Sequence, residues 1–522
     1  MMVKKQKYKV GIDIGGTNTD LVLVDSENAI VAQTKTATTT DINSGIKTAL
    51  THVLKESQVN SEEICGIFIG TTQIANAILQ HKNLYKVGVI RVAGHHPTSI
   101  PSCFLWPQEL KNSLYVDTIT VGGGYECDGY PITPTNHAEI KAAIEALVKK
   151  KVESIAVVGA FSSLNPCQEL LVKEIAHQIT KGVIPISLSH QIGGTGFIER
   201  ENSTILNAAV KQVMTKAFQG LASTCSELGF VSPMWITQNN GSIIDLNHAI
   251  EFPILTISAG PTNSFIGGMK LAKMQDAIVI DVGGTSTDVG IVRKGIPRRC
   301  LNNSKIGGIS LNFPMPDLYS IGMGGGSHIE VDKSKVQIGP QSCGNRTFID
   351  SLSFGGKQLT LTDIALVLGH VTIPGAESQR VLLSHKGCRA VLDEAIKQLY
   401  ALVGKIGPEE QSLPIIMIGG GSSLFPKKLL DGRFVIPPYA HVANAYGAAL
   451  AQISGVVDTV VSLEDRQEVL AKLQQQAIQM AIQKGADYQT VKVENIEIIP
   501  YHYVPNRMAR VIIHAAGNQP PL

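Results

Sequence analysis

Apolar and polar positions alternate along this chain in blocks that predict strands and helices in turn. The apolar run SIAVVGAF at 154–161 follows a stretch at 137–151 in which apolar residues recur at helical spacing. Strands that alternate with helices predict an α/β fold with a largely parallel sheet. Further strands are predicted at 29–35, 87–94 and 233–244, further helices at 41–56, 258–272, 388–404, 441–453 and 463–485, a strand, turn and helix at 61–80, and two strands at 491–517 with a turn near Pro505–Asn506.

Two predicted hairpins carry nearly the same eight residues. The sequence is DIGGTNTD at 13–20 and DVGGTSTD at 281–288, and each copy lies between two apolar runs. This pattern predicts a strand, a tight glycine turn and a second strand, with an acid at the end of the first strand. The two copies indicate a duplicated half-domain whose loops close on one phosphate chain from opposite sides.

The composition of these turns suits phosphate groups. Adjacent glycines let backbone N–H groups approach phosphate oxygens without an intervening Cβ, and consecutive N–H groups form a concave anion site. We expect Asp13 and Asp281 to hold Mg²⁺, usually through its waters, because Mg²⁺ prefers carboxylate and phosphate oxygens. Two ordinary hairpins with Gly-Gly turns are the alternative. The predicted phosphate-binding residues are Gly15, Gly16, Thr17, Asn18, Thr19, Gly283, Gly284, Thr285, Ser286 and Thr287.

Asp20 and Asp288 end the two hairpins, and a turn-capping role is predicted for them in preference to catalysis. Two further loops contain three consecutive glycines after an apolar run. Gly419, Gly420 and Gly421 are predicted to lie flat against the adenosine of a nucleotide, with a helix-entry turn as the alternative. The other loop, Gly324, Gly325 and Gly326, is predicted to lie near the nucleotide or the interface between lobes.

The length of 522 residues is too great for one hydrophobic core and predicts several domains. We expect a first lobe at 1–190 with the first hairpin, and a second lobe at 191–455 with the second hairpin and the adenosine loop. A helix and two strands are expected at 456–522. The polar, glycine-containing stretch from 187 predicts a connector, after which Asn202 or Ser203 caps a long helix.

Composition narrows the classes of partner. The formal net charge of +2 gives no reason to expect nucleic acid or an anionic membrane as a partner. No apolar stretch is long enough to span a bilayer, and no segment of signal-peptide type precedes the first hairpin, so a cytoplasmic location is expected. The eight cysteines form no C-x-x-C pair, which argues against a zinc or disulfide framework.

An ordered series of motifs resembles the hydantoinase A/oxoprolinase family, within the superfamily of actin, sugar kinases and heat-shock ATPases. The matching segments are GIDIGGTNTDLVLVD, IGTTQIANAIL, FIERENSTILNAAV, SAGPTNS, VIDVGGTSTDVGIV, IGMGGGS, LTLTDIALVLG and ANAYGAA. The resemblance implies two lobes of ribonuclease-H-like fold that enclose ATP and Mg²⁺ in a cleft. It also implies an ATP-dependent hydrolase that opens a cyclic amide of the hydantoin or 5-oxoproline type after phosphorylating its carbonyl oxygen. A second subunit of hydantoinase B type, and hence an oligomer, is implied as well.

The resemblance also nominates residues that would act on the substrate. Besides Asp13 and Asp281, the catalytic candidates are Thr71 and Thr72, and the substrate-binding candidates are Gly70, Asn76 and Arg200. An ordinary helix N-cap is the alternative for the threonine segment. A salt bridge with Glu199 or Glu201 is the alternative for the arginine, and Thr362 and Asp363 are expected to cap a helix.

Two departures from the family leave other functions open. Members commonly have histidine at the positions of Ile69 and Gln168, so an imidazole is missing at both places. A small-metabolite kinase of the same superfamily is therefore one alternative to the amide hydrolase. An ATP-binding regulatory subunit without catalysis is another.

Overall fold

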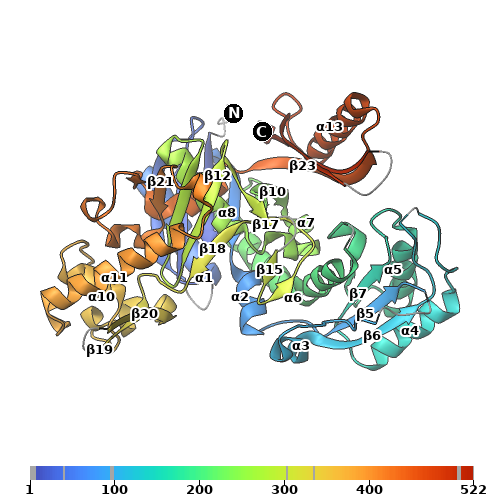
Figure 1. Cartoon of the computed structure of the whole chain (residues 1–522), viewed down its shortest axis with the longest axis horizontal. Helices are drawn as coiled ribbons and strands as arrows, with labels where there is room; N and C mark the ends of the chain where they lie inside the picture. Colours follow the sequence, from blue (N-terminus) through green and yellow to red (C-terminus); the bar gives the residue numbers. More distant parts are fainter. Residues whose placement is uncertain are drawn as a thin grey trace.

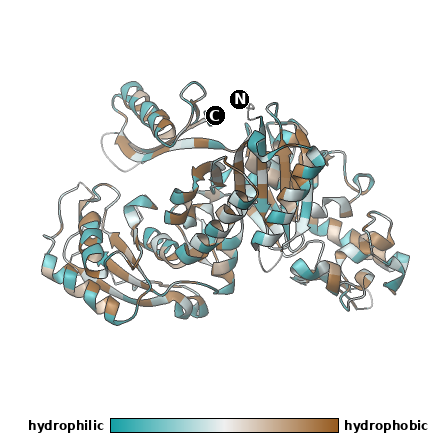
Figure 2. Ribbon diagram, turned by 180° about the vertical axis from the view of Figure 1, so that it is seen from behind, coloured by the Kyte–Doolittle hydropathy of each residue, from teal (hydrophilic) through white to brown (hydrophobic). Residues whose placement is uncertain are grey.

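The computed structural model describes residues 7–38, 42–94, 99–127, 129–194, 196–300, 304–332, 335–501 and 507–520. The predicted turn at Pro505–Asn506 lies outside these residues. Figure 1 shows the sheets of the two lobes overlapping in this view, a domain around β5, β6 and β7 to the lower right, and an extension with α13 at the upper right. Figure 2 shows that the strands at the centre are mainly hydrophobic, whereas the outward-facing turns of the helices are hydrophilic.

The first lobe is built on a nine-stranded sheet in which β1, β2 and β3 are antiparallel and β4 joins β1 in parallel. Its order is β24-β25-β23-β10-β9-β4-β1-β2-β3. The strands are β1 (Tyr8–Ile14), β2 (Asn18–Val24), β3 (Ile30–Ala37), β4 (Ile64–Thr71), β9 (Met234–Thr237), β10 (Ser242–Asp245), β23 (Gln452–Ser462), β24 (Lys492–Pro500) and β25 (Met508–Gly517).

The second lobe repeats the central part of this sheet. Its strands are β13 (Ile296–Pro297), β12 (Thr287–Arg293), β11 (Ala277–Val282), β21 (Ile415–Ile418) and β22 (Phe434–Val435), with β18 (Leu318–Ile321) also beside β12. Asp281 pairs with Asp288 across β11 and β12, just as Asp13 pairs with Asp20 across β1 and β2. In both lobes a parallel strand follows on the other side, β21 or β4. The predicted duplication and two-lobed α/β class are confirmed.

Residues 87–188 form a separate four-stranded sheet in which every pairing is parallel. It contains β6 (Tyr115–Val121), β5 (Val87–Val92), β7 (Ser154–Gly159) and β8 (Ile186–Leu188), together with α4 (His137–Lys149) and α5 (Cys167–Thr180). The parallel strand predicted at 154–161 is therefore present. The predicted segments 1–190, 191–455 and 456–522 do not each form one sheet, because all three contribute strands to the sheet of the first lobe.

The long helix α6 spans Phe197–Glu227 and begins before the predicted caps, Asn202 and Ser203. Both caps are buried inside it, where Asn202 accepts a hydrogen bond from the Trp106 indole at 2.9 Å and Ser203 donates to the Glu199 carbonyl at 2.8 Å. Polar side chains that find partners inside a helix can resemble an N-cap in sequence. The predicted start was therefore wrong by almost two turns, since the N-cap of α6 is Gly196.

The remaining elements cover the sheets. The helices are α1 (Ile42–Ser57), α2 (Gln73–Gln80), α3 (Gln108–Leu114), α7 (Leu246–Glu251), α8 (Ala259–Ala272), α9 (Thr347–Asp350), α10 (Leu361–Val367), α11 (His385–Val403), α12 (Ala443–Ala449) and α13 (Arg466–Gln483). The strand pairs are β14 (Arg299–Cys300) with β17 (Met315–Pro316), β15 (Lys305–Ile306) with β16 (Ile309–Ser310), and β19 (Ser327–Asp332) with β20 (Lys335–Ser342).

Helices α8 and α12 cross in direct backbone contact. A Cβ atom placed on Gly267 would lie 1.8 Å from the Ala443 carbonyl oxygen, and one on Gly447 would lie 1.9 Å from the Asn263 carbonyl oxygen. Only glycine permits such an approach. This contact fixes the positions of Ser264 on α8 and of the side chains on the first turn of α12.

The C-terminal strand β25 carries a histidine whose environment predicts acid sensitivity. His514 is 6% exposed, and burial, followed by the charges of Arg299 and Lys484, lowers its pKa to about 3. Between that value and the ordinary 6.5 the unfolded chain binds the extra proton. The free energy of unfolding therefore falls as the pH falls through this window, by up to about 1.4 kcal/mol per pH unit.

We expect His514→Gln to remove this contribution, because glutamine does not titrate. Between pH 7 and pH 5 the melting temperature of the variant should fall less than that of the unaltered protein, measured by differential scanning fluorimetry. His52→Gln is the matched control, since the His52 side chain is 62% exposed. An equal fall in melting temperature between pH 7 and pH 5 for the unaltered protein and His514→Gln would show that His514 is not the source of the acid sensitivity.

Candidate functional site

A cavity of about 860 Å³ lies between the two lobes, and both glycine hairpins line it. A Cβ atom placed on Gly284 would lie 3.3 Å from the side chain of Thr17, so the two turns face each other closely. Predicted site residues that line this cavity are Asp13, Gly15, Gly16, Thr17, Asn18, Thr72, Asp281, Gly283, Gly284, Thr285, Ser286, Gly325, Gly326, Gly419, Gly420 and Gly421. Hereafter it is called the inter-lobe cavity.

The two turns have the same geometry. The Gly15 amide donates to the Asn18 carbonyl at 3.0 Å, and the Gly283 amide donates to the Ser286 carbonyl at 2.9 Å. Each turn is thus a closed loop of four residues whose glycine faces are open to the cavity. Backbone of this kind presents N–H groups to an anion.

Thr19 and Thr287 were predicted to bind phosphate, but both are buried and neither lines the cavity. Successive side chains on a strand point to opposite faces. Consequently the residues before and after each threonine face the cavity, and the threonine faces the protein. The Thr287 hydroxyl donates to the Met323 carbonyl at 2.6 Å, and the Thr19 hydroxyl lies 3.3 Å from that of Thr38. These two threonines support the turns from behind.

Two carboxylates from opposite lobes share the inter-lobe cavity. Asp13 is 4% exposed, and burial, then the charges of Asp20 and Asp281, raise its pKa to about 7. Burial likewise raises the pKa of Asp281, and a hydrogen bond from the Ser264 hydroxyl partly offsets this rise. Among the described residues the Asp13 Oδ1 atom has no hydrogen-bond partner. The site therefore concentrates negative charge around an unpaired oxygen.

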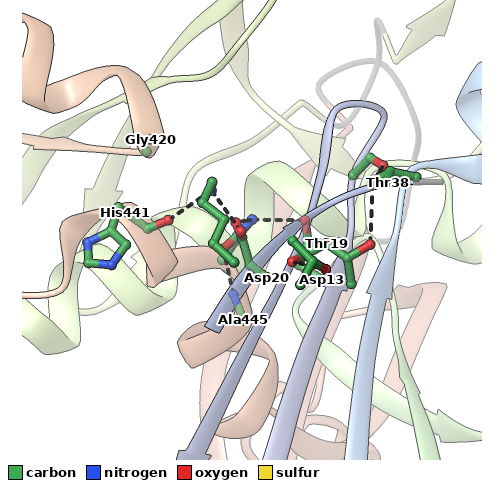
Figure 3. A network of polar contacts seen from close by, with 12 residues as sticks. Asp13, Thr19, Asp20, Thr38, Gly420, His441 and Ala445 are labelled. Carbon is green, nitrogen blue, oxygen red and sulfur yellow. Dashed lines mark hydrogen bonds and ion pairs between the residues drawn. The ribbon is translucent and has the colours of Figure 1, made fainter. Parts of the chain in front are cut away.

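Asp20 and Asp288 do not cap the turns, contrary to the prediction. Asp20 accepts hydrogen bonds from Lys35 Nζ at 2.7 Å and from Asn444 Nδ2 at 3.0 Å. Asn444 Nδ2 also donates to Asp13 Oδ2 at 2.8 Å, so this amide of α12 links the two acids of the first hairpin (Figure 3). Asp288 accepts from the Ser320 hydroxyl, and burial raises its pKa to about 6. All four hairpin acids line the cavity.

The loop of Gly419, Gly420 and Gly421 packs against the second hairpin. Gly419 has φ +87°, and a Cβ atom there would lie 2.2 Å from Asp281 Oδ1. Gly420 lies close to Lys35, whose Nζ would be 3.4 Å from an added Cβ. The apolar side chains that line the cavity come from this region and from two neighbouring segments: Phe348, Val371, Ile373, Pro374 and Leu424. This part of the cavity suits a flat, partly apolar group.

The other triple-glycine loop, Gly324 to Gly326, is hydrogen-bonded to the turn of the second hairpin. The Gly325 amide donates to the Gly283 carbonyl at 3.1 Å, and the Gly326 amide donates to the Gly284 carbonyl at 2.8 Å. Gly324 does not line the cavity, and a Cβ atom there would lie 2.6 Å from the Gly284 carbonyl carbon. Thr362 donates to the Gly325 carbonyl at 2.8 Å. The expected capping role holds for Asp363, which forms a capping box with Thr360 at the start of α10.

Of the segment 70–76, only Thr72 lines the inter-lobe cavity. Gly70 lies directly beside Asp13, because an added Cβ would be 2.7 Å from Asp13 Oδ1. The Thr71 hydroxyl accepts a hydrogen bond from the Gln73 amide at 3.2 Å, but the N-cap residue of α2 is Thr72, whose side chain makes no capping hydrogen bond. Asn76 Nδ2 donates to the Thr72 hydroxyl at 3.4 Å. The segment thus packs behind the first turn.

Arg200 is 1% exposed and does not line the inter-lobe cavity. Its guanidinium donates to the Ser189 hydroxyl at 2.9 Å and to the carbonyls of Gly194 and Gly159 at 2.7 and 2.5 Å. The neighbouring Glu201 pairs instead with Arg91, at 2.6 Å. In this conformation Arg200 joins α6 to the parallel sheet of residues 87–188.

The two positions that depart from the family have structural roles. Ile69 is fully buried in β4. The Gln168 side chain accepts a hydrogen bond from the Gly124 amide at 2.6 Å, so it holds the glycine-rich loop after β6. The next residue, Glu169, is fully buried and accepts from His190 Nδ1 at 2.6 Å.

Several residues that line the inter-lobe cavity were not predicted as site residues. They are Lys35 on β3, Gly260, Pro261 and Ser264 on α8, His441 before α12, and Asn444 on α12. The segments SAGPTNS and ANAYGAA, already noted as motifs, contain four of these six residues. Their polar and small residues at helix starts were the available signal.

The protein groups that could take part in a metal site here are carboxylates. Among the described residues no group of three or more His, Cys, Asp or Glu side chains could hold a metal ion. Mg²⁺ usually takes one or two carboxylates and completes its shell with waters and substrate phosphates. If Mg²⁺ binds here, Asp13 and Asp281, which both line the cavity, could contribute such carboxylates.

Two regions of the chain match models of known protein families. The hydantoinase/oxoprolinase N-terminal region matches residues 9–180, and the hydantoinase/oxoprolinase domain matches residues 200–374. The chain belongs to the hydantoinase/oxoprolinase family. The predicted resemblance is thereby confirmed, and the two matched regions contain the two hairpins.

Characterised relatives of this family member are enzymes or enzyme subunits. Caprolactamase subunit alpha of Pseudomonas jessenii is 27% identical over 394 residues, which cover 71% of this chain and 55% of the relative. Acetophenone carboxylase gamma subunit of Aromatoleum aromaticum is 25% identical over 420 residues, covering 74% and 57%. The 5-oxoprolinase of Dictyostelium discoideum is 28% identical over 261 residues, covering 45% and 19%. The chain thus matches little more than half of the first two relatives.

Two solved structures share the fold over almost the whole chain. The ATP-dependent caprolactamase of Pseudomonas jessenii has a TM-score of 0.75 at 19% identity, covering 98% of this chain and 88% of that one. Nucleotide-free acetone carboxylase, which is also ATP-dependent, has a TM-score of 0.74 at 18% identity, covering 99% and 88%. In the described part of this family member, no helix has the length and apolar character needed to cross a bilayer.

Proposed function

We propose that this chain uses ATP to phosphorylate the carbonyl oxygen of a cyclic amide, of the hydantoin or 5-oxoproline type, so that the ring can be opened by water. The observation that carries the proposal is the pair of facing glycine turns in a cavity that Asp13, with an unpaired carboxylate oxygen, also lines. The ATP-dependent caprolactamase, and relatives that include 5-oxoprolinases, support the choice of a cyclic amide.

Different segments that line the inter-lobe cavity would bind different parts of Mg·ATP. The turns at 15–18 and 283–286 would hold the phosphates through backbone N–H groups, with Asp13 and Asp281 holding Mg²⁺. Mg²⁺ would neutralise phosphate charge when bound. The loop at 419–421 and its apolar neighbours would hold the adenosine. Asn444 and Lys35 keep the acids of the first hairpin in place, which preserves the geometry that phosphoryl transfer requires.

The chemistry explains why ATP would be needed. An amide carbonyl is a poor electrophile because nitrogen donates electron density to it. Phosphorylation of the oxygen converts it into a leaving group and exposes the carbon to attack. Thr72, Gly260 and Pro261 line the part of the cavity formed by the first lobe and α8, which makes them the candidates for contact with the amide.

A partner chain is part of the proposal. Several relatives are named as subunits: caprolactamase subunit alpha, acetophenone carboxylase gamma subunit and acetone carboxylase beta subunit. We infer that a second subunit of hydantoinase B type accelerates ring opening by positioning the water that attacks the activated carbon, a step that bulk water would carry out slowly with this chain alone. The phosphorylation itself would then be a property of this chain.

An isotope experiment tests the proposal. Hydantoin, 5-oxoproline and caprolactam, each labelled with ¹⁸O at the carbonyl, are incubated with the protein and Mg·ATP, and the released phosphate is analysed by mass spectrometry. If the carbonyl oxygen attacks the γ-phosphorus, expulsion of phosphate from the ring carbon carries the label into inorganic phosphate. Unlabelled phosphate would mean that water attacked phosphorus, in ATP or in the phosphorylated amide, and would contradict ring opening by expulsion of phosphate. A parallel incubation with common sugars and Mg·ATP tests the kinase alternative, which a phosphorylated sugar as the only product would indicate.

A further inference from the structure

A second cavity, of about 790 Å³, lies between the two lobes and the C-terminal strands. It shares none of its described lining residues with the inter-lobe cavity. Lys9 of β1 lines it from the first lobe, Lys294 and Arg299 from the segment after β12, and Lys492 from β24. We call it the basic cavity. Its volume lies within the range of sites for small molecules.

Positive charge dominates the basic cavity. Five cationic side chains line it, against one acid, Glu494, among the described residues. The five are Lys9, Lys270, Lys294, Arg299 and Lys492. In the described part of the chain none of them has a carboxylate within 4.0 Å, whereas Arg298, beside one of them, pairs with Asp317 at 2.8 Å. Five cations around one space repel one another, so an anion with several charges would stabilise them.

Arg299 is the least solvated of these cations. It is half-buried, burial lowers its pKa, and its one hydrogen bond to the described residues is a long one, from Nη2 to the Asn240 carbonyl at 3.4 Å. A guanidinium carries five N–H donors in a planar fork that matches carboxylate and phosphate oxygens. The low pKa of the adjacent His514 has the charge of Arg299 as its second cause, which reflects the positive field there. Most of the N–H donors of this guanidinium therefore have no hydrogen bond to the described residues and are available to an oxyanion.

The basic cavity is connected to the inter-lobe cavity through two helices. Helix α8 lines the inter-lobe cavity with Ser264 and the basic cavity with Lys270. Helix α12 lines the first with Asn444 and the second with Tyr446, whose hydroxyl donates to the Asn28 carbonyl at 2.8 Å. The backbone contact of these helices at Gly267 and Gly447 provides a direct packing route between the two cavities.

We propose that the basic cavity binds a small polyanion, with two or more carboxylate or phosphate groups, and that its occupancy changes the nucleotide affinity of the inter-lobe cavity. The anion contacts Lys270 on α8 and bridges Lys9 and Lys492 on the first sheet to Lys294 and Arg299 on the second lobe. It therefore holds the two lobes in one relative position. The second half of the proposal rests on the proposed function, but the first half does not.

Calorimetric titration of the full chain with citrate and, separately, with pyrophosphate tests the first half, with EDTA present and no nucleotide. We expect at least one probe to bind. Arg299→Gln and Lys270→Gln should each weaken it by about tenfold, since a hydrogen bond to a charged group contributes roughly 1.5–3 kcal/mol. The control Lys149→Gln removes one exposed lysine of α4, outside both cavities, and should leave binding unchanged. Binding of citrate would indicate a ligand with carboxylate groups, and binding of pyrophosphate would indicate a ligand with phosphate groups.

Two outcomes overturn the anion site: no binding of either probe, or binding that both cavity variants retain. Melting curves check that the variants are folded, and Lys270→Gln, at an exposed position, provides a test if Arg299→Gln unfolds. For the second half, saturating citrate or pyrophosphate should change the Kd for Mg·ATP by about fivefold or more in the unaltered protein but not in Arg299→Gln. An unchanged Kd overturns the coupling, while the calorimetric result stands independently of nucleotide binding.

Discussion

Asp13→Asn is expected to weaken ATP binding by about 100-fold when Mg²⁺ is present and to strengthen it when Mg²⁺ is removed. Loss of groups that merely orient metal ligands typically costs 10–100-fold, so loss of a ligand itself should reach the upper end of that range. The asparagine oxygen can still accept from Asn444, and its NH₂ group then takes the place of the unpaired Oδ1. Without Mg²⁺, that group donates to phosphate, and a repulsive charge is gone.

The opposite signs in the two conditions separate a metal role from damage to the fold. A raised pKa means that the ionised Asp13 opposes folding as the pH rises from 3.8 to about 7. The variant should therefore melt no lower than the unaltered protein at pH 7.5. Asp393→Asn, on the exposed face of α11, is the matched control. Isothermal titration with ATP, in Mg²⁺ and in EDTA, measures both effects, and equal losses in the two buffers would remove Asp13 from the metal site.

Gly447→Ala should destabilise the protein by about 3 kcal/mol, although helix propensity alone predicts a gain of about 1 kcal/mol. The new Cβ would lie 1.9 Å from the Asn263 carbonyl oxygen and 2.9 Å from the Gly267 nitrogen, and both are backbone atoms that cannot rotate away. Helices α8 and α12 must then separate. Overpacking usually costs 1–3 kcal/mol, and contact with rigid backbone belongs at the upper end.

The matched control is Gly432→Ala, where an added Cβ meets nothing within 4 Å. Its melting temperature should stay close to that of the unaltered protein, whereas Gly447→Ala should melt several degrees lower. Because Asn444 and Ser264 belong to the displaced helices, ATP affinity should fall as well. A melting temperature for Gly447→Ala equal to or above that of the control would show that the helices accommodate the methyl group.

Local patterns predicted the two hairpins well. Each consists of two strands and a four-residue turn, and their strand pairing, turn closure and placement of acids depend on residues only a few positions apart. The orientation of Thr19 and Thr287 followed from the same strand alternation but was overlooked. The start of α6 was wrong because Asn202 obtains its partner, Trp106, from almost a hundred residues away. The local sequence does not distinguish an N-cap asparagine from an asparagine buried inside a helix.

The sequence by itself determined the family, the duplicated half-domain and the turns that face the inter-lobe cavity, because glycine turns and strand periodicity are short-range properties. Only the tertiary structure decided that Lys35 and Asn444 join Asp13 and Asp20 in one network, and that Arg200 lies away from it. It also decided that five cations from four regions of the chain line the basic cavity. These arrangements depend on which distant segments meet when the sheets pack, and no local pattern encodes that meeting.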